Sequence, residues 1–239
     1  MGTKGPRGSN TRNRLSARAL DLRAPLTEPS PTLITSYPRQ LSDMRPLHEI
    51  NERCLEFLMR AAHADSPTFP LVSYLRDLFL STTPETQARV AHRPVLLVDM
   101  QFTNGELWRT VQDNPARPIA GPAWQGTFPR PAAVQLAEST LLLAWHTIHA
   151  APQEVGLLGM TTDVADVIGQ LAITEIAPVA KSLFGHLRPR WEDRPAVWRR
   201  MILSARSKDP WRARELSLYC VQLLTADLIS PASRSRSAS

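Results

Sequence analysis

The sequence predicts an all-α fold: a single multi-helix, bundle-like domain with a disordered basic arm before it and a short disordered tail after it. Three observations favour this class. Between residues 41 and 230, apolar residues recur at helical spacing, prolines and capping residues separate these stretches, and no convincing pair of strands is visible. With 239 residues and 43% hydrophobic content, the chain can bury one core of about eight to ten helices.

The basic charge of the chain lies at its two ends. Residues 1–40 hold few large apolar side chains and many prolines, so we expect a disordered arm and Pro-rich linker there. Of the net charge of +6, residues 1–23 carry +5, and the tail at 231–239, which we also expect to be disordered, carries +2. The helical domain at 41–230 is therefore nearly neutral and, taken whole, gives no electrostatic argument for nucleic acid.

Cysteine usage and hydropathy bear on location. Cys54 and Cys220 lie in apolar stretches without disulfide-like spacing, which is typical of buried thiols in a reducing compartment. The apolar run at 141–145 is far shorter than the ~20 residues that cross a bilayer. We therefore expect a cytoplasmic protein without a membrane span. The Arg-rich, acid-poor composition of residues 1–23 leaves an organellar transit peptide as the minority alternative.

The first helix is expected near residue 41, where Ser42 or Asp43 can cap it and Pro46 stands in its first turn. Its apolar residues share one face and its glutamates and arginines share the other, which is typical of a helix that covers a core. Asn51 falls inside the apolar face. Because a buried amide needs hydrogen-bond partners, we expect Asn51 to find them there.

Prolines and turns delimit the next elements. Pro70 begins a second apolar helix, and Thr83 caps a short third one that starts at Pro84. The run PVLLVDMQF at 94–102 fits either a buried strand or a buried helical turn. We predict helix there, because no second convincing strand is present to pair with it. After an Asn-Gly turn, a short helix is expected around 107–111.

Residues 113–130 are expected to form a long loop, because four prolines and two glycines leave no regular element intact. Trp124 and Phe128 give this loop side chains to bury. They pack either against the body of the protein or against a ligand or partner.

Two apolar helices, at 131–150 and 162–177, each carry one narrow polar arc. The weak catalytic candidates of the sequence lie on these arcs: His146, His149, Asp163 and Asp166. If the arcs face each other, a carboxylate can hold an imidazole in a partly dry pocket. Alternatively, each arc is the water-facing edge of a buried helix. No histidine has a glutamate three residues before it, so the Glu-x-x-His pairs of di-iron bundles are missing. We predict no metal site and no cofactor.

Two more helices are expected near the C-terminus. Asp193 caps one that begins at Pro195, and Asp209 caps the last one, which begins at Pro210 and runs to about residue 229. Large apolar residues surround the last helix nearly all round. We therefore expect it to be largely buried.

The segment 188–214 combines arginine with tryptophan. It holds eight arginines and one lysine against three acids, with three tryptophans interleaved. This composition suits nucleic acid, anionic lipid or a protein hot spot. Alternatively, the tryptophans belong to the core and arginine stems cover them. Together with the loop, the segment supplies the candidate binding residues Trp124, Phe128, Arg190, Trp191, Trp198, Arg199 and Arg200.

The common nucleotide, hydrolase and metal motifs are absent from the sequence. The leading hypothesis is therefore a non-enzymatic protein-interaction or regulatory protein that binds another protein or a second copy of itself. It predicts that Trp124 or Trp198 is substantially exposed. One alternative is an enzyme or small-molecule binder with a His/Asp-lined pocket between the two arc-bearing helices. The other is nucleic-acid binding through 188–214.

Overall fold

A computed structural model of the chain describes residues 1–2, 43–64, 69–113 and 128–229. The expected arm, the tail and most of the Pro/Gly loop, with Trp124, lie outside these residues. The described residues are all-α, as predicted. Their α-helices are α1 (Arg45–His63), α2 (Pro70–Leu80), α3 (Pro84–Ala91), α4 (Gly105–Asp113), α5 (Arg130–Ala150), α6 (Thr162–Gln170), α7 (Ile176–Leu183), α8 (Pro195–Arg206) and α9 (Pro210–Ile229). Three short 3-10 helices and one pair of two-residue strands complete them: η1 (Pro152–Leu158), η2 (Ile173–Glu175), η3 (Phe184–His186), β1 (Val98–Asp99) and β2 (Arg188–Pro189).

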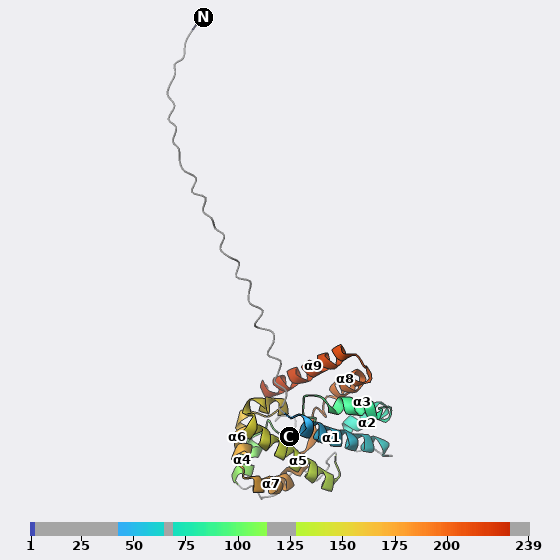
Figure 1. Cartoon of the computed structure of the whole chain (residues 1–239), viewed down its shortest axis with the longest axis vertical. Coiled ribbons are helices and arrows are strands. Elements are labelled where there is room, and N and C mark those ends of the chain that lie inside the picture. Colours follow the sequence, from blue (N-terminus) through green and yellow to red (C-terminus); the bar gives the residue numbers. More distant parts are fainter. Residues whose placement is uncertain (3–42, 65–68, 114–127, 230–239) are drawn as a thin grey trace. The chain divides into compact units, whose positions relative to one another are not determined.

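Helix α5 lies in the middle of the helical domain, with α1 on one side and α6 and α7 on the other (Figure 1). Its core residues come from more than one face, among them Leu136, Leu141 and Ala144, each at most 1% exposed. Burial from several sides explains why this helix is apolar around most of its circumference.

The segment at 94–102 is not a helix, so that prediction was wrong. It crosses the core in an irregular conformation with several bends, and Val95, Leu96 and Leu97 are fully buried. Only two of its residues form a strand, β1, which pairs antiparallel with β2. The partner strand is two residues long and contains a proline, so the sequence has no strand pattern there that could have predicted it.

Asn51 of α1 satisfies backbone groups of this irregular segment from one side. Its side-chain amide donates to the carbonyl oxygens of Ala91 and Val95 at 3.0 and 2.9 Å, and its Oδ1 accepts from the Leu97 N–H at 2.7 Å. The expectation that Asn51 finds buried partners is confirmed. The bonds replace part of the ladder that a regular helix or sheet would have provided.

Arg190 satisfies the segment from the other side. Its Nε donates to the Leu96 carbonyl at 2.8 Å, and its Nη2 donates to the carbonyls of Leu158 and Val98 at 2.7 and 3.2 Å. Only 5% of the residue is exposed. A β-carbon at Gly159, where φ is +68°, would collide with the guanidinium. Glycine is therefore required there both for the backbone conformation and for space.

The helix predicted at 162–177 is interrupted, which corrects its length. α6 ends at Gln170, and the chain passes through η2 into α7. The carboxylate of Glu175 accepts from the N–H of Ala172 at 2.7 Å and so starts the new turn. Pro178 then falls in the first turn of α7, where a proline is tolerated.

The apolar helices of the described ranges belong to a core. No single helix there is long and apolar enough to cross a membrane; the one pair that qualifies jointly, Thr162–Gln170 with Ile173–His186, is bent by 101°. Its large side chains, such as Val164, Ile168 and Leu183, are fully buried within the protein. Core packing therefore accounts for their hydrophobicity.

The expectation that the last helix is largely buried was wrong. Leu216, Cys220 and Leu224 of α9 face the core, whereas Trp211 and Ile229 are 74% and 76% exposed. The helix runs along the edge of the domain and contacts α8 and η1 (Figure 1). Only one of its faces therefore has neighbours to bury it.

Of the predicted helix caps, two are confirmed and one is wrong, while at the first helix the N-cap residue is Met44 and Asp43 Oδ1 accepts from the Arg45 N–H at 3.0 Å. Thr83 Oγ1 accepts from the backbone N–H three residues on at 3.3 Å, and Asp209 Oδ1 accepts from the N–H two residues on at 2.9 Å. Asp193 does not cap α8, whose N-cap residue is Arg194. The Asp193 carboxylate instead lies in solvent, 73% exposed.

Candidate functional site

The two polar arcs face different neighbours. His146 lies in a pocket between α1 and α5, and His149 is exposed, with its Nδ1 2.8 Å from the Trp145 carbonyl. Asp163 lies over the start of α4, where a β-carbon at Gly105 would collide with its carboxylate.

The contact between α5 and α6 is apolar. Ile148 of α5 packs against Gly169, and the indole of Trp145 donates to the carbonyl of Leu171 at 2.9 Å. Asp166 on α6 is exposed. The geometry therefore favours arcs that face water over arcs that form a shared His/Asp pocket.

Much of the Arg/Trp segment is structural. Trp198 is fully buried and its indole donates to the carbonyl of Arg190 at 2.8 Å, while Trp191 is 4% exposed and donates to Asp227 at 2.8 Å. Of the two tryptophans of which one was expected to be exposed, Trp198 is therefore buried, and Trp124 lies outside the described residues. Arg190, Trp191 and Trp198 therefore have a structural role here, because their side-chain N–H groups donate hydrogen bonds to partners inside the protein.

Phe128, the described end of the Pro/Gly loop, is 1% exposed and packs edge-on against Phe57 at 5.7 Å between ring centroids. Of the two alternatives for this side chain, the structure favours packing against the body of the protein. Trp124 lies outside the described residues.

The exposed part of the segment borders a groove between α2 and α8. The groove has a volume of about 650 Å³. Its walls are formed by Ser73, Tyr74, Leu75, Arg76, Asp77, Leu78, Ser81, Arg199 and Leu203. Tyr74 is 74% exposed and Leu203 38%, so two large apolar side chains meet solvent in one hollow. Exposed aromatic and aliphatic side chains that lie together in a surface hollow are candidates for contact with a partner.

The cations near this groove differ in whether they are already bound. Arg76 donates to the carbonyl oxygens of Ala62 and Ala64, at 3.0 and 2.9 Å. Arg206 donates to the Ser81 hydroxyl at 2.7 Å, which ties α8 to the end of α2. Among the described residues, no carboxylate lies within ion-pair distance of Arg199. Its guanidinium is therefore available to a partner.

Arg200 has a different environment from its neighbour in sequence. Its guanidinium pairs with Glu215 at 2.7 Å and lies 4.1 Å from the ring centroid of Tyr219. Both partners belong to α9. Arg200 therefore links α8 to α9 on the surface, and Arg199 alone of the two points toward the groove.

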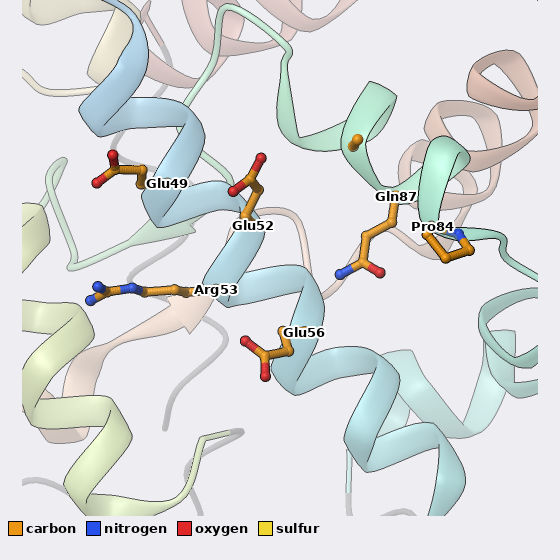
Figure 2. Close-up of a pocket in the computed structure, with 7 residues that line it drawn as sticks. Glu49, Glu52, Arg53, Glu56, Pro84 and Gln87 are labelled. Carbon is orange, nitrogen blue, oxygen red and sulfur yellow. The ribbon is translucent and has the colours of Figure 1, made fainter.

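A second hollow, of about 400 Å³, lies between α1 and α3 and is acidic. Figure 2 shows Glu49, Glu52 and Glu56 on α1, with Gln87 of α3 directed toward them and Arg53 extending to the opposite side. All these side chains of α1 are exposed. Within the described ranges, no group of three or more His, Cys, Asp or Glu side chains is placed to hold a metal ion. We interpret this hollow as a solvated helix face.

Two histidines stack beside this acidic face. The rings of His48 and His92 are 4.5 Å apart, and His92 Nε2 lies 3.2 Å from Glu52 Oε1. Burial lowers the pKa of His48, and the neighbouring His92 lowers it further because two adjacent imidazolium ions repel each other. Folding therefore shifts His48 toward its neutral form relative to a free histidine.

Comparisons with known proteins identify no relative: no family model, no curated protein and no solved structure matches the chain. The fold and its surfaces define the class of the molecule as an all-α protein with a cation-bordered groove whose lining mixes polar and apolar side chains. Function has to be inferred from that geometry.

Sequence reasoning found Arg199 but missed Tyr74 and Leu203. Tyr74 stands within an apolar run that reads as a buried helix, and Leu203 reads as a core leucine of the arginine-rich helix. Their exposure depends on how far apart α2 and α8 lie, which no local pattern specifies.

Proposed function

We propose that the protein is a non-enzymatic interaction protein that binds a partner protein in the groove between α2 and α8. The observation that carries the proposal is that exposed Tyr74 and Leu203 line one hollow with Arg199, which has no ion-pair partner within the described ranges. Aromatic and arginine side chains are the residues in which binding energy concentrates at protein interfaces.

The chemistry of the groove describes its partner. Apolar side chains of the partner can replace water on Tyr74 and Leu203, and a carboxylate can accept hydrogen bonds from Arg199. A short acidic segment with one or two large apolar residues, helical or extended, meets both requirements. A protein that binds its partner without catalysing a reaction can control how much of that partner is free. We therefore propose a regulatory role. The buried free thiols of Cys54 and Cys220 support a reducing compartment such as the cytoplasm for this role.

The two alternative functions have less support. In the segment 188–214, Arg190, Trp191 and Trp198 make internal contacts and are buried. Fewer aromatic rings and cations are therefore available to stack on bases or bind phosphates. Catalysis by the two arcs requires a histidine and an aspartate close together. His146 lies between α1 and α5, whereas Asp163 lies over the start of α4.

A pair of matched variants tests the proposal. Leu203→Glu places a like-charged obstacle for an acidic partner inside the groove, whereas Leu218→Glu makes the same change on α9, at a leucine that is 47% exposed. Partners retained by the wild type are identified by quantitative mass spectrometry. The strongest is then purified and titrated by calorimetry.

We expect Leu203→Glu and Arg199→Glu each to weaken that purified complex by about tenfold or more, and Leu218→Glu to leave it unchanged. Full retention of the partner by both groove variants would reject the groove. Binding of a fluorescent single-stranded DNA with steep salt dependence, lost on Arg199→Glu, would replace the proposal with the nucleic-acid alternative.

A further inference from the structure

A pocket of about 470 Å³ lies between α1 and α5, remote in sequence from the α2 and α8 residues of the proposed docking groove. Its apolar lining is formed by Pro46, Ile50, Leu142, Leu143, Ala150 and Ala151. His146, Ser139 and Thr147 add polar groups along α5. The volume falls in the range of about 300–1,000 Å³ that small-molecule sites occupy.

Glu154, in the first turn of η1, also lines this pocket. The residue is only 5% exposed, and among the described residues its buried Oε2 has no hydrogen-bond partner. Leaving a buried polar group unpaired costs free energy that proteins usually avoid. The other buried polar atoms in this condition belong to Arg89, Arg93 and His186, none of which lines the pocket. Of the buried polar atoms without a partner in the part of the chain that the structure describes, the Glu154 oxygen is therefore the one that belongs to a residue lining this pocket.

The charges of the pocket select the ligand. Its acids are Asp43, which is already paired with Arg45 at 2.8 Å, Glu49 at the rim and Glu154. Arg53 is the one arginine in the lining, and no cation of the described residues lies within ion-pair distance of Glu154. The balance is negative, so an anionic ligand is disfavoured and a cation is favoured.

The geometry points to a binding site for a small organic cation, with an ammonium or guanidinium group on an apolar, ring-sized body. The cationic N–H groups donate to the carboxyl group of Glu154 where it lines the pocket, and their positive charge compensates the buried carboxylate. The apolar body covers Ile50, Leu142 and Leu143. This site is independent of the groove between α2 and α8.

Three indoles that differ in one group test the charge requirement on the full-length protein. Tryptamine carries an ammonium, tryptophol replaces it with a hydroxyl, and indole-3-acetate carries a carboxylate. By calorimetry or NMR titration, we expect tryptamine to bind with a Kd of about 1 mM or tighter. Tryptophol should bind at least about tenfold more weakly, and indole-3-acetate more weakly still. Equal binding of the three indoles would overturn the proposal.

Variants locate the site. Glu154→Gln should weaken tryptamine at least about tenfold with little effect on tryptophol, whereas Glu106→Gln, at an exposed glutamate of α4, should change neither. Ala150→Leu should also block tryptamine, because it fills the exposed mouth of the pocket while it leaves the carboxyl in place. Ala226→Leu on the exposed face of α9 is its control.

Circular dichroism melting of each variant separates lost binding from lost folding. If Glu154→Gln does not fold, Ala150→Leu decides. Undiminished tryptamine affinity in the folded pocket variants would overturn the assignment. Leu203→Glu, which disables the docking groove, should leave tryptamine binding intact, so failure of one proposal is distinguishable from failure of the other.

Discussion

Removing the donors of Arg190 is expected to be among the most destabilising substitutions of a polar residue in the domain. Arg190→Met keeps much of the apolar stem but deletes the guanidinium that donates to the carbonyls of Leu96, Val98 and Leu158. Each buried acceptor left without a donor costs about 1–3 kcal/mol, so the three together cost about 3–9 kcal/mol. Because small domains are stable by only about 5–15 kcal/mol, this change alone removes a large part of the free energy of unfolding.

The measurement is urea unfolding followed by circular dichroism, with Arg199→Met as the matched control. Arg199 is exposed and has no ion pair among the described residues, so its loss should change the free energy of unfolding by about 0.5 kcal/mol or less. Arg190→Met should shift the unfolding midpoint strongly to lower urea, or leave the chain unfolded in buffer. The reasoning would be refuted if the free energies of unfolding of the two variants, calculated from their urea midpoints, differed by less than about 1 kcal/mol.

Three further predictions follow from burial and backbone geometry. Burial lowers the pKa of His48 and His186 below the ordinary 6.5, so the unfolded chain binds more protons than the folded one below that pH. The free energy of unfolding should therefore fall as pH drops below about 6.5, and replacing both histidines by glutamine should flatten urea-unfolding midpoints over roughly pH 5.5–6.5. Burial raises the pKa of the thiols of Cys54 and Cys220, the latter to about 12, so neither should react with Ellman's reagent until urea unfolds the chain; rapid native labelling would contradict this. Gly159→Ala should destabilise the domain by about 1 kcal/mol or more through its positive φ and the collision with the buried guanidinium, and an unchanged melting temperature would disprove that account.

The parts of the fold that the sequence predicted are those that local chemistry determines. The caps at Thr83 and Asp209 depend on a side chain and an N–H two or three residues away, and both are confirmed. The polar position of Asn51 on an apolar face correctly indicated buried hydrogen bonds. What the sequence did not reveal was that its partners lie up to 46 residues away, at Leu97.

The errors share one physical cause, which is dependence on distant partners. The segment 94–102 has the composition of a buried helix, but its backbone is satisfied by Asn51 and Arg190 instead. The sequence left Trp198 either exposed or in the core, and the turn that begins at Arg190 decides for the core. In the same way, Leu203 became a groove residue only once α8 was positioned against α2.

In the candidate sites, single residues were predictable and their grouping was not. Arg199 and His146 stood out by type and position. Glu154 did not, because a glutamate after a proline at a helix start ordinarily faces water and complements the helix dipole. Its burial results from the packing of η1 against α5 and α9.

The internal bonds of Arg190 also govern the order of events during synthesis. The apolar run at 94–99 leaves the ribosome before its second set of donors, because Arg190 follows Leu96 by 94 residues. At about 5–20 residues per second, that delay is roughly 5–19 s. During this interval the nascent chain carries a hydrophobic, strand-prone segment that lacks the hydrogen bonds which Arg190 later donates to its carbonyls. Such a segment is a natural substrate for holding chaperones, and chains truncated before residue 190 should aggregate rather than fold.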